Sequence, residues 1–327
     1  MTPAELTSTN GARAAAGELI SAEGLTKWYG SRAAVDGLAL AARAGEIVGL
    51  LGPNGAGKTT TLSMLSGVIA PDAGTVKIGG FVVASDPIVA RRKLGLVPQS
   101  IALYPTLTAL ENLHFFGQIQ GLGARDAATC ASKLLATVGL SDRANDIVAG
   151  FSGGMKRRLN LACGMIHSPA VLLLDEPTVG VDPQSRGRIF EVVETAARAG
   201  AAVIYSTHYM EEVERLCSRV ILIDHGHVVA GGTSAELIAL AGSAPRIDVL
   251  TRDELKPGWC DGIGRAVVFA DGARFGASLE LAALDQAPEV IRRAERAGGE
   301  VLEVHLHRPN LQDAFLKLTG HALRDRQ

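Results

Sequence analysis

Residues 51–65 read LGPNGAGKTTTLSML. Glycine and proline break regular structure, so their concentration directly before a run of good helix formers needs a physical reason. The spacing Gly52-x-x-x-x-Gly57-Lys58-Thr59 fits a phosphate-binding loop, in which glycines let backbone N–H groups crowd around an anion. The stretch therefore predicts a nucleotide phosphate site at the start of a helix.

The residues on either side of this loop supply the context that the motif requires. The preceding residues 46–51, EIVGLL, form a short aliphatic run that favours a strand. The following residues place Leu62, Leu65 and Ile69 at helical spacing. Strand, loop and helix therefore follow one another as in phosphate-loop proteins. The residues expected to bind the phosphates are Gly52, Pro53, Asn54, Gly55, Ala56, Gly57, Lys58, Thr59 and Thr60.

Composition limits the classes of protein to which the chain could belong. The 327 residues are 47% hydrophobic, which is enough for a large core and two domains. The net charge of −2 gives no global basic field, so no nucleic-acid partner is expected. The four cysteines are far apart and lack metal-ligand spacing, which indicates ordinary thiols in a reducing compartment.

The sequence contains no segment that predicts membrane insertion or secretion. No apolar run approaches the 18 or so residues that a spanning helix needs. The first residues lack the basic and then apolar pattern of a signal peptide. We therefore expect a cytoplasmic protein, and a membrane role would require a separate partner. Residues 1–18 are small and polar and are expected to form a disordered leader.

The order of predicted elements indicates an α/β fold with two domains. Alternating strand and helix patterns over residues 19–242 predict a largely parallel sheet covered by helices. Within this domain, residues from about 105 to 160 read as a helical subdomain. Residues 243–327 predict a second, smaller α+β domain of plausible size.

A second motif, VLLLDEP at residues 171–177, places two carboxylates after a fully apolar strand. Ligands of open α/β sheets lie outside the carboxyl ends of the strands. Asp175 is expected to hold Mg²⁺ through a water, with Thr59 as a direct ligand. Glu176 could accept a proton from a water that attacks the γ-phosphate. The alternative is a merely acidic turn, which is a poor reason for two acids at this position.

A third motif, FSGGMKRRL at residues 151–159, places small residues before another predicted helix. Ser152, Gly153 and Gly154 would form a second anion site at that helix N-terminus. A plain helix cap is the alternative if the motif is taken alone. The basic run that follows, Lys156–Arg158, is expected to form a solvated helix face, with contact to the nucleotide or a partner as the alternative.

Taken together, these motifs resemble those of the ATP-binding subunits of ABC transporters, and they occur once each in the family order. The resemblance implies that Gln99 is the Q-loop glutamine, which contacts the metal ion and the attacking water. It implies that Asp182 lies in the D-loop, which communicates across a dimer. His208 would be the switch histidine at the γ-phosphate, and Tyr29, with Trp28 as its neighbour, would stack on adenine.

A finer resemblance concerns the direction of transport. Met155 stands where the general signature has glutamine, as in ATPases of drug, antibiotic, sodium and polysaccharide export. Residues 308–325, RPNLQDAFLKLTGHALRD, resemble the ending of daunorubicin/doxorubicin-resistance-type ATPases. The chain is thus expected to be an ATP hydrolase that energises an exporter, using ATP and Mg²⁺. Phosphate-loop enzymes of this kind draw most of their rate from charge neutralisation at the transferring phosphoryl group.

The resemblance also implies partners and a location. The subunit would form a head-to-tail homodimer or heterodimer with two ATP molecules between the subunits. It would lie peripherally at the cytoplasmic face of the membrane, and its helical insert at about 105–146 would receive a helix of a separate membrane-spanning permease.

Two other functions remain open from the sequence. A soluble ABC ATPase acting on ribosomes or DNA is disfavoured because the chain has one cassette, no coiled-coil insertion and no basic patch. A phosphate-loop kinase or GTPase of another family is disfavoured because the signature, the Q-loop and the switch histidine occur together.

Overall fold

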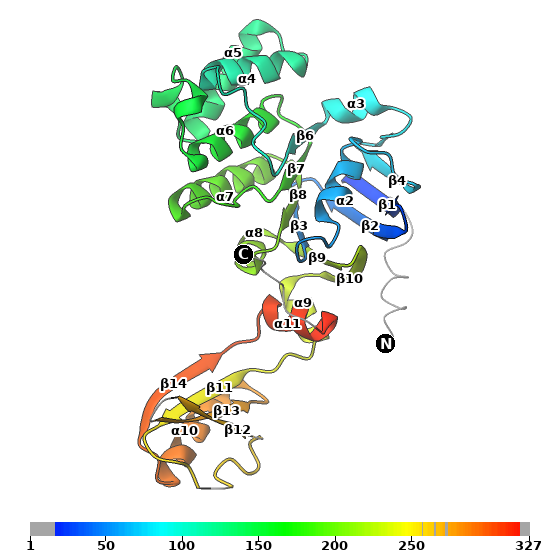
Figure 1. Cartoon of the computed structure of the whole chain (residues 1–327). Helices are drawn as coiled ribbons and strands as arrows, with labels where there is room; N and C mark the ends of the chain where they lie inside the picture. The colour runs from blue at the N-terminus through cyan, green and yellow to red at the C-terminus, as the bar shows by residue number, and fades with distance from the viewer. Residues whose placement is uncertain (1–16, 257, 265, 272–273, 321–327) are drawn as a thin grey trace. The chain divides into compact units, whose positions relative to one another are not determined.

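The computed structural model describes residues 17–256, 258–264, 266–271 and 274–320 (Figure 1). The expected leader lies almost wholly outside the described residues. The chain divides into two compact units between Thr233 and Ser234. This is several residues before the boundary expected at 242, because α9 (Ser234–Leu240) packs against α11 (Leu311–Thr319) in the second unit.

A six-stranded sheet forms the centre of the first unit. Its strand order is β10-β9-β3-β8-β7-β6; β10 pairs antiparallel with β9, and all other neighbouring strands run parallel. Both β3 and β7 are buried along their whole length, which explains their continuous aliphatic sequences. The strands are β3 (Ile47–Leu51), β6 (Leu94–Val97), β7 (Val171–Asp175), β8 (Ala202–Thr207), β9 (Arg219–Asp224) and β10 (His227–Gly232).

A second, antiparallel sheet in this unit has the order β2-β1-β4-β5. Its apolar side chains share one core with the large sheet and with the helix that follows the phosphate loop; Leu25, Leu50 and Leu62 are examples. The elements are β1 (Glu18–Tyr29), β2 (Arg32–Arg43), α2 (Lys58–Leu65), β4 (Ala73–Ile78), β5 (Phe81–Val82) and α3 (Pro87–Arg92).

A group of helices packs around a second apolar core of the first unit, whose buried residues include Leu113, Leu135 and Leu159. Figure 1 shows α4 and α5 packed together with α6 beside them. A capping box between Thr108 and Glu111 begins α4, since each side chain accepts a hydrogen bond from the other's backbone N–H. The helices are α4 (Ala109–Ile119), α5 (Ala124–Thr137), α6 (Gly153–Met165), α7 (Pro183–Arg198) and α8 (Met210–Leu216).

The second unit is a small α+β structure. Its antiparallel sheet has the order β12-β13-β11-β14. Val290 and Ala294 of α10 (Ala287–Arg296) share a buried core with Ile247 and Val249 of β11. The strands are β11 (Arg246–Thr251), β12 (Ala266–Asp271), β13 (Arg274–Glu280) and β14 (Val301–His307). Within the described ranges of both units, no helix combines the length and the hydropathy needed to cross a bilayer.

Candidate functional site

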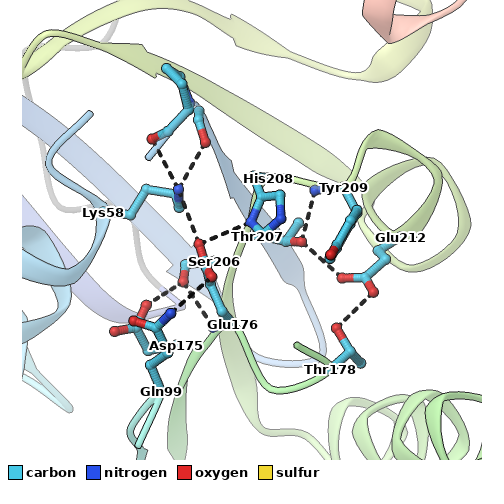
Figure 2. Close-up of polar contacts among 12 residues, drawn as sticks. Lys58, Gln99, Asp175, Glu176, Thr178, Ser206, Thr207, His208, Tyr209 and Glu212 are labelled. Carbon is cyan, nitrogen blue, oxygen red and sulfur yellow. Dashed lines mark hydrogen bonds and ion pairs between the residues drawn. The ribbon is translucent and has the colours of Figure 1, made fainter. Parts of the chain in front are cut away.

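The strand order brings the predicted motifs to one edge of the large sheet. β3 lies next to β8, β8 lies next to β7, and all three run in parallel, so the segments after them emerge side by side. The next strand, β6, adds the segment that carries Gln99. Figure 2 shows the resulting polar cluster of Lys58, Gln99, Asp175, Glu176 and His208. Ligands of parallel sheets bind at this carboxyl edge.

The loop after β3 is a backbone cradle that only glycine allows. A Cβ atom at Gly52 would lie 2.2 Å from the carbonyl oxygen of Ile223. Gly57 has φ of 107°, and a Cβ atom there would lie 2.5 Å from the carbonyl oxygen of Ala34. Helix α2 begins at Lys58, and the first N–H groups of a helix have no partner within the helix. The loop and helix therefore fit a phosphate group.

Lys58 is held at the centre of the cluster. Its ammonium donates to the carbonyl oxygens of Gly52 at 2.8 Å and Pro53 at 3.1 Å, and it lies 3.2 Å from Oε1 of Glu176. The residue is only 5% exposed. Burial lowers the pKa of Lys58, while the neighbouring carboxylates of Glu176 and Asp175 oppose that shift. A buried ammonium that lies along the phosphate loop is poorly screened by water, so it interacts strongly with anions.

Glu176 turns away from the strand that precedes it. Its φ of 46° lies in the left-handed region, which is uncommon for a residue with a side chain. The carboxylate accepts a hydrogen bond from Nε2 of Gln99 at 3.2 Å, and Nδ1 of His208 lies 3.2 Å from its other oxygen. Lys58, Gln99 and His208 thus surround the carboxylate of Glu176. All four were predicted catalytic residues.

Asp175 occupies a different position from its neighbour. It is the last residue of β7 and is 4% exposed. Its Oδ1 accepts a short hydrogen bond of 2.6 Å from Oγ of Ser206 on β8, and the same hydroxyl lies 3.2 Å from the backbone nitrogen of Glu176. A fixed carboxylate oxygen near hydroxyl groups is a suitable environment for Mg²⁺, which prefers oxygen ligands.

A cavity of 360 Å³ opens beside this cluster. Its size suits a nucleotide phosphate chain, and it is lined by a mixture of predicted residues and new ones. The described lining residues are Tyr29, Arg32, Ala34, Asn54, Gly55, Gly57, Lys58, Thr59, Thr60, Gln99 and Glu176. Tyr29 lines the cavity, whereas Trp28 is not among these residues and donates its backbone N–H to Asp72 at 2.7 Å.

The sequence reasoning missed Arg32 and Ala34, which line the cavity, and Ser206, which contacts Asp175. Arg32 reaches the phosphate loop by donating to the carbonyl oxygen of Gly55 at 3.3 Å, and Ser206 fixes Asp175. Arg32 directly follows a turn that joins β1 to β2 and pairs with Tyr29, so its place beside the expected adenine-stacking residue was a usable signal. Ser206 stands two residues before His208, but no motif marked it.

The signature residues, Ser152–Gly154, lie elsewhere in this chain. None of them, nor Asp182, is among the described residues that line the cavity. Ser152 begins α6 by accepting a hydrogen bond from the N–H of Met155 at 3.3 Å. Asp182 caps α7 in the same way, since its carboxylate accepts a hydrogen bond from the N–H of Ser185 at 2.8 Å. Hydrogen bonding with Ser185 lowers the pKa of the Asp182 carboxyl group. Their expected nucleotide contacts stay predictions.

Helix α6 also reaches the Q-loop, which the sequence reasoning did not anticipate for its basic run. Arg157 was expected on a solvated face, but its guanidinium donates to the carbonyl oxygen of Gln99. One helical turn later, Oδ1 of Asn160 accepts a hydrogen bond from the N–H of Ala102 at 3.1 Å. Burial lowers the pKa of Arg157, while Glu176 and Asp175 oppose the shift. The signature helix and the Q-loop are therefore joined at two points.

The two signature glycines differ in the space around them, which gives a stability prediction. A Cβ atom at Gly154 would lie 2.4 Å from Oγ of Ser185 and 2.8 Å from Oδ2 of Asp182, whereas at Gly153 the nearest atom is 4.0 Å away. We expect Gly154→Ala to lower the free energy of unfolding by about 1–3 kcal/mol through overpacking. Gly153→Ala, the matched control, should be neutral or slightly stabilising because alanine favours helix. Thermal unfolding of the two variants checks this, and equal midpoints would contradict it.

Comparisons with known proteins agree with this geometry. A family model described as ABC transporter matches residues 35–179. A linearmycin resistance ATP-binding protein of Bacillus subtilis is 42% identical, over 94% of this chain and 100% of its own length. The chain belongs to the ABC transporter family. The predicted family is therefore confirmed.

Other relatives of this ABC subunit extend over nearly its whole length. A Nod factor export ATP-binding protein of Paraburkholderia xenovorans is 40% identical over 91% of this chain and 96% of its own. The daunorubicin/doxorubicin resistance ATP-binding protein of Streptomyces peucetius is 36% identical over 94% of each chain. The resemblance to daunorubicin/doxorubicin-resistance-type ATPases is likewise confirmed.

Solved structures match about two thirds of this ABC subunit. An ATP-binding subunit of an ABC transporter has a TM-score of 0.64 and 29% identity, covering 68% of this chain and 93% of that one. A dimeric ATP-binding cassette in a post-hydrolysis state, bound to ADP and Pi, has a TM-score of 0.60 and 25% identity, covering 65% of this chain and 98% of that one. The predicted fold class, an α/β phosphate-loop ABC ATPase, is confirmed, and the chain is an ATPase of this family.

Proposed function

We propose that this chain is the ATP-binding and ATP-hydrolysing subunit of an exporter and that it acts with a separate membrane-spanning permease. The observation that carries the proposal is the shared carboxylate of Glu176, which Lys58, Gln99 and His208 surround at the carboxyl edge of the sheet. Relatives named for resistance and for export support the exporter over an ATPase acting on ribosomes or DNA.

In this proposal the phosphate loop and Lys58 bind the triphosphate, and Tyr29 stacks on adenine. Thr59 and Asp175 would hold Mg²⁺, with Gln99 beside them; the hydroxyl and carboxylate oxygens of this set suit that ion. When bound, Mg²⁺ neutralises developing charge on the phosphates. Glu176 accepts the proton of the attacking water, and His208 contacts the γ-phosphate.

To accept a proton from water, Glu176 must give up its present contacts with Lys58 and His208. In the structure its carboxylate contacts the Lys58 ammonium at 3.2 Å and the His208 ring at 3.2 Å. Both carboxylate oxygens thus face other side chains, since Oε2 accepts a hydrogen bond from Nε2 of Gln99. Attraction of Lys58 by phosphate oxygens would release Glu176 toward water, so binding and activation of the base are coupled.

A dimer would use the residues that do not line the cavity. We place Ser152, Gly153 and Gly154 of one subunit against the nucleotide of the other, in a homodimer or heterodimer, with Asp182 nearby. The helix N-terminus at Gly153 offers free N–H groups for a γ-phosphate. A ligand that contacts both subunits shifts the equilibrium toward the closed dimer by its differential affinity.

Affinity purification tests the exporter. Tagged Glu176→Gln protein is purified with ATP from detergent-solubilised membranes of the native host, and its partners are identified by mass spectrometry. We expect a protein with many membrane spans at near-equal stoichiometry, located with this subunit at the cytoplasmic face. Tagged Lys58→Ala protein is the matched control for ATP-dependent assembly. Recovery of ribosomal or DNA-repair proteins with no membrane partner would contradict the proposal.

A further inference from the structure

A second buried polar cluster lies beside the ATPase site and centres on Glu212 (Figure 2). Glu212 belongs to α8 and is 2% exposed. Its Oε1 accepts a hydrogen bond of 2.6 Å from the Thr178 hydroxyl, and its Oε2 accepts one of 2.8 Å from the Thr207 hydroxyl. The Tyr205 hydroxyl donates to Oε2 at 3.1 Å. Three hydroxyl donors on one buried carboxylate form a closely satisfied network.

The partners of Glu212 come from segments that carry the proposed catalytic groups. Thr178 stands two residues after Glu176, in the loop between β7 and α7. Thr207 directly precedes His208, and its hydroxyl also accepts a hydrogen bond of 3.0 Å from the N–H of Tyr209. The Thr207 hydroxyl therefore fixes the backbone on both sides of His208.

A third segment closes the cluster. Nε of Arg186, on α7, lies 3.7 Å from Oε1 of Glu212, and the guanidinium carbon lies 5.5 Å from the centre of the Tyr209 ring. Asp182, the predicted D-loop residue, is the N-cap of helix α7. The carboxylate thus joins the loop after Glu176, the switch segment and the D-loop helix.

We propose that Glu212 is a positioning residue for ATP hydrolysis, which holds His208 in register with the loop that carries Glu176. The inference rests on the proposed function, because it assigns those two residues a role at the γ-phosphate. It extends that function to a residue that contacts neither the cavity nor the Lys58 cluster directly.

Positioning explains the buried charge better than stability does. Removing a carboxylate from water is costly, and buried ion pairs contribute little net stability compared with well-packed apolar residues. Each of the three hydroxyls instead donates to the carboxylate in a preferred direction, so the three hydrogen bonds together fix one arrangement of these side chains. A shift of about 1 Å in a catalytic group lowers a rate about 10²-fold, so such precision has a kinetic effect.

The test uses the full chain and follows His208 by chemical modification as well as by activity. Diethylpyrocarbonate modifies accessible imidazoles, and mass spectrometry reads each histidine separately. The His208 side chain is 12% exposed, whereas that of His225 is 79% exposed and serves as an internal reference. In Glu212→Ala we expect modification of His208 to accelerate about tenfold while that of His225 stays unchanged, since the anchor of the switch segment is lost.

Activity should change in kcat rather than in ATP affinity. We expect Glu212→Ala to lower kcat about 10²-fold and to leave KM for ATP within about threefold, because the phosphate loop keeps its contacts. Glu212→Gln retains a carbonyl oxygen for the Thr207 hydroxyl and should recover most of kcat. Glu211→Gln, at the exposed neighbouring position on α8, is the matched control and should behave as wild type.

Thr207→Val provides a second test that holds even if Glu212→Ala does not fold. Valine matches threonine in shape and removes only the hydroxyl that links Glu212 to the switch segment, so we expect the same selective rise in His208 modification. Unchanged His208 modification in both variants, or equal acceleration at His208 and His225, would overturn the inference. Wild-type protein without ATPase activity would instead contradict the proposed function, while the modification rates would still test Glu212.

Discussion

Lys58→Ala is expected to remove ATP turnover, with a loss of about 10²–10³-fold or more. The Lys58 ammonium is the cation that the phosphate loop directs into the cavity, where it is 5% exposed and poorly screened by water. Preorganised donors at a transferring phosphoryl group contribute rate enhancements of about this size. Steady-state ATPase assays and nucleotide titration of the purified variant measure the effect.

The control for this substitution is an exposed lysine. Lys133→Ala removes a lysine from α5, in the helical part of the unit, and should leave turnover unchanged. Thermal unfolding should accompany both variants, because Lys58→Ala also leaves the buried Glu176 without its 3.2 Å partner. Near-normal ATPase activity in a folded Lys58→Ala protein would refute the assignment of the phosphate loop.

Glu176→Gln is expected to bind ATP, to hydrolyse it about 10²–10⁴-fold more slowly, and to accumulate as a closed dimer. Glutamine keeps the shape and a carbonyl acceptor for the Gln99 amide but cannot take a proton from water. Without hydrolysis, the ligand that contacts both subunits stays in place. Size-exclusion chromatography with light scattering, in Mg²⁺ and saturating ATP, measures the dimer.

The matched condition is the same variant with ADP, which lacks the γ-phosphate and should leave the protein monomeric. A Glu176→Gln protein that stays monomeric at saturating ATP would contradict the homodimer. The heterodimer would then be examined by adding a second ATPase subunit from the same host, with the same readout.

Local sequence patterns were sufficient for the elements that carry the site. The strand before the phosphate loop and the helix after it are β3 and α2, because an aliphatic run and helical spacing each act within a few residues. The acidic motif likewise follows a buried strand, β7. Gln99 and His208 were found only through the resemblance, since one glutamine and one histidine carry no local signal.

The contacts between these elements depend on packing across the sheet, which the sequence pattern does not encode. Ser206 reaches Asp175 from the neighbouring strand, and Glu212 reaches Thr178 across 34 positions of sequence. The need for glycine at position 52 was predicted from the phosphate, but the structure adds a second cause, the carbonyl of Ile223. Such causes arise where strands distant in sequence become neighbours.

The pairing of α9 with α11 bears on how the second unit is built into the chain. The backbone enters this unit through α9 and ends it with α11; the two helices touch, and Nζ of Lys317 donates to the carbonyl oxygen of Gly242 at 3.0 Å. The four-stranded sheet and α10 therefore form a long insertion between two helices that contact each other, as in a helical hairpin. A change in the length or sequence of that insertion would leave the contact between α9 and α11, which holds both of its ends, in place.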